Sequence, residues 1–120
     1  MMTIDIWSIG CIFAEMFSGK PLFTGLNDND QIKKIFRIMG TPNEKVYPNI
    51  KKLSEWNPEN FEVYPAQELK TLYPTMEEEG LKLLEAMLRI DPDARISTDE
   101  ILVHPYFDEI QSTIIKEIYK

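Results

Sequence analysis

The sequence predicts a mainly α-helical fold, and three observations lead to this prediction. Apolar residues recur at helical spacing in several segments, capping residues flank those segments, and no segment alternates polar and apolar residues over the length of a strand. The 120 residues suffice for one domain with a modest core. A content of 43% hydrophobic and 28% charged residues is typical of a globular chain.

The first expected helix, residues 4–18, is apolar on nearly every side. Its only acids are Asp5 and Glu15, and we expect Thr3 to cap its start and Gly19 to end it. A helix without a polar face is predicted to be surrounded by protein rather than to lie on a surface.

The second expected helix, residues 28–39, is amphipathic. Its apolar residues follow the spacing of one helical face: Ile32, Ile35, Phe36 and Met39. Gly40 is expected to end this helix, and Thr41-Pro42 prevents its continuation.

Residues 41–74 break the helical pattern. Five prolines punctuate this stretch and are interleaved with Tyr47, Trp56, Phe61, Tyr64 and Tyr73. Because those aromatic side chains need a surface to bury against, the stretch is predicted to be an ordered, mostly irregular insertion with a short helical turn near residues 44–47.

Helical patterns return in the C-terminal part. The Thr75–Glu78 spacing is that of a capping box, and an apolar stripe follows at Leu81, Leu84 and Leu88. After a break at residues 91–95, the segment 97–100 predicts a second capping box and a short helix ending near residue 104. The spacing of Ile110, Ile114 and Ile118 then predicts a helix in the tail, residues 109–120.

Composition bounds the functional classes. The net charge of −7 gives no basic footprint, so neither nucleic acid nor a membrane surface is an expected partner. The single cysteine, Cys11, forms no internal disulfide and is expected to pack among apolar residues, which fits an intracellular protein. We see neither a bilayer-spanning run nor a signal peptide.

The sequence predicts no catalytic, cofactor-binding or metal-binding residue. No G-x-G is present, and His104 is the only histidine, which excludes a histidine-based metal cluster. Ser97 and Asp99 lie near it but are better explained by helix capping than by a triad. His104 itself is expected at a helix end.

Two charged residues leave alternatives open. Asp5 either offsets the dipole in the first turn of its helix or is drawn inside, where backbone N–H groups must satisfy its carboxylate. Arg95 either pairs at the surface with a nearby aspartate or reaches inward to a carboxylate.

Several motifs together resemble the eukaryotic protein kinase family, and more narrowly the cyclin-dependent kinases. They are "DIWSIGCIFAEM", "GKPLF.G.ND.DQI..IF.IMGTP" and "L..ML..DP..RIS..E.L.HPYF", in family order over about residues 3–108. The resemblance implies the C-terminal part of the large helical lobe, from its central helix onward. It divides the chain into a partial kinase domain, residues 1–108, with an insertion at about 41–74, and a tail.

The resemblance also implies structural roles for four residues. Asp5 matches the aspartate that accepts hydrogen bonds from catalytic-loop amides. Trp7 and Gly10 match positions that pack under the activation segment. Arg95 matches the arginine that pairs with the glutamate ending that segment.

In this family, transfer of the ATP γ-phosphate to protein serine or threonine needs motifs that precede the central helix. None of them occurs in this chain, so we expect ATP and Mg²⁺ only in the full-length family and no catalysis by these 120 residues alone. The expected partner is the missing N-terminal kinase portion. Without it, the face carrying Trp7 and nearby isoleucines should be exposed and favour self-association.

The alternative hypothesis is a non-catalytic binding module. The second helix and the insertion resemble the region that meets a small regulatory subunit in cyclin-dependent kinases, whereas cyclin contacts are not expected here. The candidate docking residues are Asp30, Gln31, Trp56, Phe61 and Tyr64. For each aromatic residue, the simpler interpretation is that it only anchors the insertion. An unrelated helical domain is the third possibility.

Overall fold

The computed structural model describes residues 2–119, apart from the side chains of residues 109–113. Its helices are α1 (Thr3–Ser18), α2 (Asp28–Met39), α3 (Leu69–Leu72), α4 (Glu78–Met87), α5 (Thr98–Leu102) and α6 (Pro105–Ile118). Three short 3-10 turns are η1 (Ile50–Lys52), η2 (Pro58–Asn60) and η3 (Pro92–Ala94). No strand occurs in residues 2–119, which confirms the prediction of a mainly α-helical fold.

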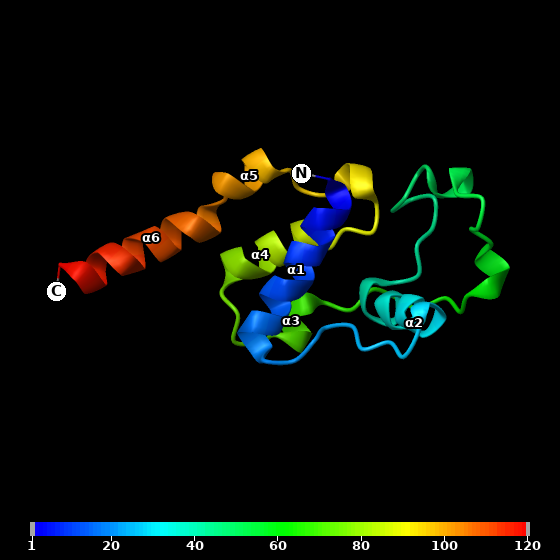
Figure 1. Ribbon diagram of the computed structural model, residues 1–120, viewed down its shortest axis with the longest axis horizontal. Coiled ribbons are helices and arrows are strands. Elements are labelled where there is room, and N and C mark those ends of the chain that lie inside the picture. The colour runs from blue at the N-terminus through cyan, green and yellow to red at the C-terminus, as the bar shows by residue number, and fades with distance from the viewer. Residues whose placement is uncertain (1, 120) are drawn as a thin grey trace.

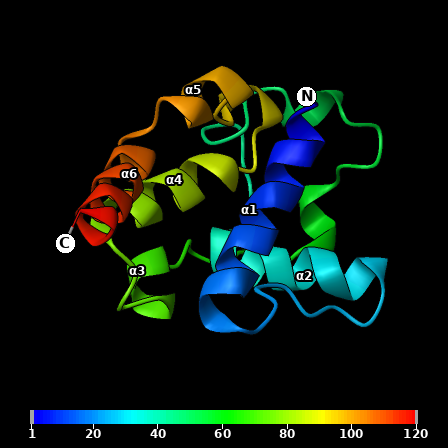
Figure 2. The ribbon, with the colours of Figure 1, turned by 60° about the vertical axis from the view of Figure 1, so that its left-hand side comes forward.

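The molecule is elongated, measuring 58 × 27 × 22 Å. In Figure 1, α1 and α4 cross at its centre, α2 and the insertion lie on one side, and α6 extends away on the other. Figure 2 shows α4 between α1 and α6. The molecule is therefore long because α2 with the insertion and helix α6 extend from opposite sides of a small helical core.

The core forms where α1 crosses α4. One face of α1 is buried, at Ile6, Gly10 and Ala14, and it packs against Leu83, Leu84, Met87 and Leu88 of the α4 segment. The two helices approach closely because Gly10 has no side chain. A Cβ atom at Gly10 would lie 2.9 Å from Leu88 Cδ2 and 3.1 Å from Met87 Cβ.

Two expectations for α1 are wrong. Its N-cap is Met2, not Thr3, which is already helical. The helix is also not surrounded by protein within this chain, because only one face meets α4 while Ile4, Ile12 and Met16 are exposed. Its end is as predicted, with Gly19 at φ 78° donating its N–H to the Glu15 carbonyl at 2.7 Å.

Helix α2 has the predicted bounds. The side chain of Asn27 caps its start by accepting from the Asp30 N–H at 2.9 Å. Gly40 ends it at φ 87°, a left-handed value that other residues rarely adopt, and donates to the Phe36 carbonyl. No residue of α2 is fully buried, so this helix depends on the insertion for its packing.

The insertion is ordered and mostly irregular, as predicted. The expected turn is present, because the Tyr47 N–H donates to the Asn43 carbonyl at 2.9 Å. The two 3-10 turns η1 and η2 and the short helix α3 were not predicted individually.

The expected capping box at Thr75 is wrong. The N–H of Met76 instead donates to the Tyr73 carbonyl at 3.1 Å, which closes a turn and buries both side chains. Helix α4 therefore begins at Glu78, three residues later, with Glu77 as its N-cap. Burial of two large side chains outweighed the local capping signal.

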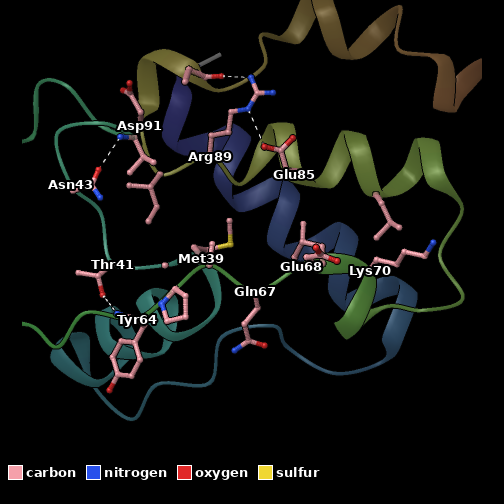
Figure 3. Close-up of a pocket in the computed structure, with 18 of the residues that line it drawn as sticks. Met39, Thr41, Asn43, Tyr64, Gln67, Glu68, Lys70, Glu85, Arg89 and Asp91 are labelled. Carbon is pink, nitrogen blue, oxygen red and sulfur yellow. Dashed lines mark hydrogen bonds and ion pairs between the residues drawn. The ribbon is translucent and has the colours of Figure 1, made fainter.

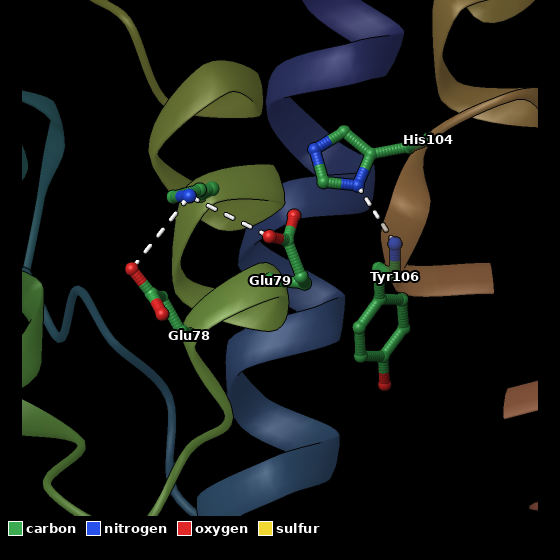
Figure 4. Close-up of polar contacts among 5 residues, drawn as sticks. Glu78, Glu79, His104 and Tyr106 are labelled. Carbon is green, nitrogen blue, oxygen red and sulfur yellow. Dashed lines mark hydrogen bonds and ion pairs between the residues drawn. The ribbon is translucent and has the colours of Figure 1, made fainter. Parts of the chain in front are cut away.

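The second capping box is confirmed. The Ser97 hydroxyl accepts from the Glu100 N–H at 3.2 Å, and Glu100 Oε1 accepts from the Ser97 N–H at 3.3 Å. His104 caps α6 as expected, since its Nδ1 accepts from the Tyr106 N–H at 3.1 Å (Figure 4).

Tyr106 fastens the start of α6 to the core. Its ring meets the edge of Phe13 on α1 with centroids 5.4 Å apart, and it also packs against Gly80 of α4. Farther along, Ile114 and Ile118 are exposed, and the predicted contribution of Ile110 lies outside the described side chains.

The close approach at Gly10 predicts that Gly10→Ala destabilises the fold. Alanine favours an exposed helix by about 1 kcal/mol, but here the added methyl group overlaps Met87 and Leu88 and should cost about 1–3 kcal/mol. The measurement is the free energy of unfolding in urea. Ser8→Ala, at an exposed position of the same helix, is the control and should have little effect. A more stable Gly10→Ala variant would contradict this packing.

Candidate functional site

Helix α1 presents an uncovered apolar face, formed by Ile4, Ile9, Ile12 and Met16. These side chains are 64%, 37%, 57% and 81% exposed. Contiguous apolar surface of this kind is typical of an interaction site in a soluble protein. The prediction that isoleucines of this helix are exposed is confirmed.

Trp7 does not share that exposure, contrary to expectation. Its ring stacks on Phe23 with centroids 5.7 Å apart and an interplanar angle of 6°. The guanidinium of Arg95 lies over the same ring, 5.0 Å from its centroid. Trp7 is therefore half-buried between a ring and a cation.

Within the described residues, Arg95 donates to backbone carbonyls and forms no ion pair with a nearby aspartate, so the surface alternative is wrong, whereas the inward pairing with a carboxylate outside these residues stays a prediction. Its Nε donates to Arg89 O at 2.7 Å, Nη2 donates to Ile90 O at 3.2 Å, and Nη1 donates to Thr3 O at 3.1 Å. One side chain thus ties the segment after α4 to the start of α1. Burial lowers the pKa of Arg95, and the nearby Tyr47 and Asp91 oppose this effect.

Asp5 is exposed and lies in the first turn of α1. Its carboxylate accepts a hydrogen bond from the Met2 N–H at 3.2 Å. This is the first-turn interpretation of Asp5 and not the buried one. The carboxylate remains accessible to further donors.

Two titratable groups lie at the core: Tyr73, which follows α3, belongs to one core cluster, and Cys11 of α1 packs against that cluster. Burial raises the pKa of the Cys11 thiol, and the charge of Arg95 opposes part of that rise. Burial also raises the pKa of Tyr73, which the neighbouring Cys11 reinforces and a hydrogen bond with Ser18 opposes. Cys11 packs against the core, as its apolar neighbours indicate.

The second candidate surface is an aromatic pocket between α2 and the insertion. Trp56 and Phe61 stack with centroids 5.3 Å apart and an interplanar angle of 9°, and the edge of Phe36 on α2 meets both rings. The pocket has a volume of about 660 Å³, and its lining also includes Asn29, Ile32, Lys33, Leu53, Glu55 and Asn60.

The structure gives Asp30 and Gln31 local bonding partners. Asp30 Oδ2 accepts from the Leu26 N–H at 2.9 Å, and Gln31 Oε1 accepts from the Gly25 N–H. Both side chains hold the loop before α2, and neither lines the aromatic pocket. The side chain of Leu26, which lies on this loop, is 93% exposed.

Tyr64 lies apart from the aromatic pocket. Its hydroxyl donates to Glu62 Oε2 at 2.7 Å, and the Arg37 guanidinium lies 5.8 Å from its ring centroid. Tyr64 instead lines a groove of about 1050 Å³ that runs between the insertion and α4 (Figure 3). The five candidate docking residues therefore divide into an α2-loop pair, the stacked pair Trp56–Phe61, and Tyr64.

Among the side chains that the structure describes, no three His, Cys, Asp or Glu residues converge as metal ligands would. No helix within residues 2–119 is both long and apolar enough to cross a membrane.

The sequence matches a known protein family. A family model for the protein kinase domain matches residues 1–107, which is nearly the whole sequence. The chain belongs to the protein kinase family. Residues 2–119 are helical and contain no strand, which is consistent with part of the helical lobe of a protein kinase.

Three contributors to these surfaces were missed from sequence. The sequence places Phe36 in the apolar stripe of the second helix and gives no sign that the rings of Trp56 and Phe61 pack against it. The carbonyl partners of Arg95 had no signal, because every residue carries a carbonyl. Thr41 was read only as the residue before a proline.

The raised pKa values of Cys11 and Tyr73 predict loss of stability in alkali. The folded state retains these protons to higher pH than the unfolded state, so stability is full below about pH 9 and falls as the pH rises through the folded pKa values. The measurement is urea unfolding at a series of alkaline pH values. Cys11→Ala should show a shallower decline than the parent chain, and equal slopes would contradict the role of Cys11.

Proposed function

We propose that this chain is the second half of the large lobe of a cyclin-dependent-kinase-like serine/threonine protein kinase. The motifs in residues 3–108 and the family match over residues 1–107 support this proposal. In the complete family enzyme, ATP with Mg²⁺ supplies the γ-phosphate that is transferred to protein serine or threonine. The residues that carry out this transfer belong to motifs outside these 120 residues, so we propose that the chain alone is inactive. We also propose that the protein acts inside the cell.

The observation that carries this proposal is the uncovered apolar face of α1. In a soluble domain, four large apolar side chains on one helix are normally buried. Burying each of them contributes about 1.5–3 kcal/mol to the stability of the folded state. The preceding half of the lobe is the natural cover, because the family mounts its catalytic elements on this helix. In that assembly, Asp5 is free to accept hydrogen bonds from catalytic-loop amides.

Arg95 fits the same assembly. Its three hydrogen bonds use Nε, Nη1 and Nη2 once each, which leaves one N–H on each terminal nitrogen for an acidic partner. The family glutamate that ends the activation segment is the proposed acceptor. Trp7 beneath the guanidinium then holds its plane in a fixed orientation.

The decisive experiment adds the missing half in trans. The second polypeptide is the N-terminal half of a cyclin-dependent kinase, ending before the central helix, and the measurements are binding by calorimetry and phosphoryl transfer to histone. Binding is expected to the parent chain, and Ile12→Glu should weaken it at least about tenfold, because a charge would be buried at the contact.

Leu102→Glu is the matched control, since Leu102 is 72% exposed on α5 and outside the apolar face of α1. It should bind like the parent chain. Phosphoryl transfer by the 120-residue chain alone would overturn the proposal, as would binding that Ile12→Glu leaves unchanged.

A second candidate function is docking of a small cyclin-kinase regulatory subunit at the aromatic pocket. The specific observation favouring it is that Trp56 and Phe61 remain partly accessible beside a pocket with amide and charged groups at its rim. Aromatic anchors surrounded by polar groups are typical of binding hot spots.

This docking function predicts that Trp56→Ala reduces capture of the regulatory subunit by the immobilised chain about tenfold or more. Val63→Ala is the control, because Val63 is 87% exposed in the same insertion and outside the pocket. Equal capture by both variants, or no capture by the parent chain, would remove this candidate.

A further inference from the structure

The first residue of the insertion, Thr41, is hydrogen-bonded to Glu62 and Tyr64, which lie farther along the same insertion. Its N–H donates to the Tyr64 carbonyl at 3.0 Å, and its hydroxyl oxygen accepts from the Tyr64 N–H at 2.9 Å. The same hydroxyl donates to the Glu62 carbonyl at 2.6 Å. Thr41 thus makes three hydrogen bonds to residues 21 and 23 positions away along the chain, and Figure 3 shows its pairing with Tyr64.

A second set of contacts lies beside this one and continues it. The Gln67 N–H donates to the Ile38 carbonyl at 2.8 Å, and Gln67 Nε2 donates to the Arg37 carbonyl at 2.9 Å. Between them the backbones nearly touch, because a Cβ atom at Gly40 would lie 2.9 Å from the Ala66 nitrogen. The end of α2 and residues 66–67 of the insertion are therefore fixed to each other.

Residues 42–63 form a loop closed at Thr41, and the far part of this loop returns to α2. It does so through Trp56 and Phe61, which pack on Phe36. These rings are separate from the two core clusters formed by α1, α4 and their neighbours. The aromatic pocket consequently depends on the loop for one of its walls and on α2 for the other.

We propose that Thr41 is a positioning residue that closes the loop 42–63 as one unit and thereby sets the geometry of the aromatic pocket. When the hydroxyl contacts of Thr41 are lost, the loop loosens and the insertion wall of the pocket becomes less well fixed, while the α1–α4 core stays folded. The loop-closing role stands on its own, and its consequence for partner docking rests on the proposed function.

The test compares Thr41→Val, which keeps the shape but removes both hydroxyl bonds, with Thr41→Ser, which keeps the hydroxyl. Amide hydrogen exchange is read at Lys52, Trp56 and Phe61 in the loop, whose N–H groups are hydrogen-bonded, and at Leu88 in the core. The loss of one hydrogen bond should speed amide exchange about fivefold. Thr41→Val loses two such bonds, so exchange in the loop should be at least about fivefold faster, while exchange at Leu88 should be nearly unchanged.

The serine variant should restore slow exchange in the loop. The proposal is overturned if Thr41→Val leaves loop exchange unchanged, if it speeds Leu88 to the same extent as the loop, or if serine behaves like valine. Binding of the regulatory subunit is measured on the same proteins. A loop that loosens in Thr41→Val while the parent chain binds no subunit would refute docking and leave the loop-closing role intact.

Discussion

The close crossing of α1 and α4 at Gly10 is the constraint on which the rest of the structure depends. With hydrogen as its side chain, Gly10 lets Met87 and Leu88 pack directly on the α1 backbone. This crossing buries Ile6 and Ala14, and it brings Phe13 to the ring of Tyr106, where α6 begins. It also brings the start of α1 within reach of Arg95, which bonds across the two segments.

The same crossing explains what the chain leaves uncovered. A helix that is apolar all round can satisfy only one face with a single partner helix, so Ile4, Ile12 and Met16 remain in solvent. The α2–insertion unit does not cover them, because its aromatic side chains are used on one another and on Phe36. The chain therefore combines a small core with two separate surfaces, an apolar helix face and an aromatic pocket.

Sequence reasoning succeeded where the signal is local. The end of α2 at Gly40 is as predicted, and the capping box at Ser97 is formed as its spacing predicts. It failed at Thr75, where an equally good capping pattern lost to burial of Tyr73 and Met76, which no local rule registers. For Arg95, the search for a charged partner overlooked backbone carbonyls, whose positions depend on the tertiary fold. The docking residues grouped differently from expectation for the same reason, since Asp30 and Gln31 are bonded to their own loop.

Methionine oxidation by dilute hydrogen peroxide, read by mass spectrometry, tests the central proposal that the apolar face of α1 binds the other half of the kinase domain. Met16 is 81% exposed on that face, whereas Met87 is 1% exposed in the core of the same molecule. Met87 therefore serves as the internal reference for the oxidation rate of Met16. The account predicts rapid oxidation of Met16 in the isolated chain, strong protection of Met16 once the complementary half is bound, and slow oxidation of Met87 in both states. Equal reactivity of Met16 and Met87 in the isolated chain, or a Met16 rate that the bound half leaves unchanged, would contradict it.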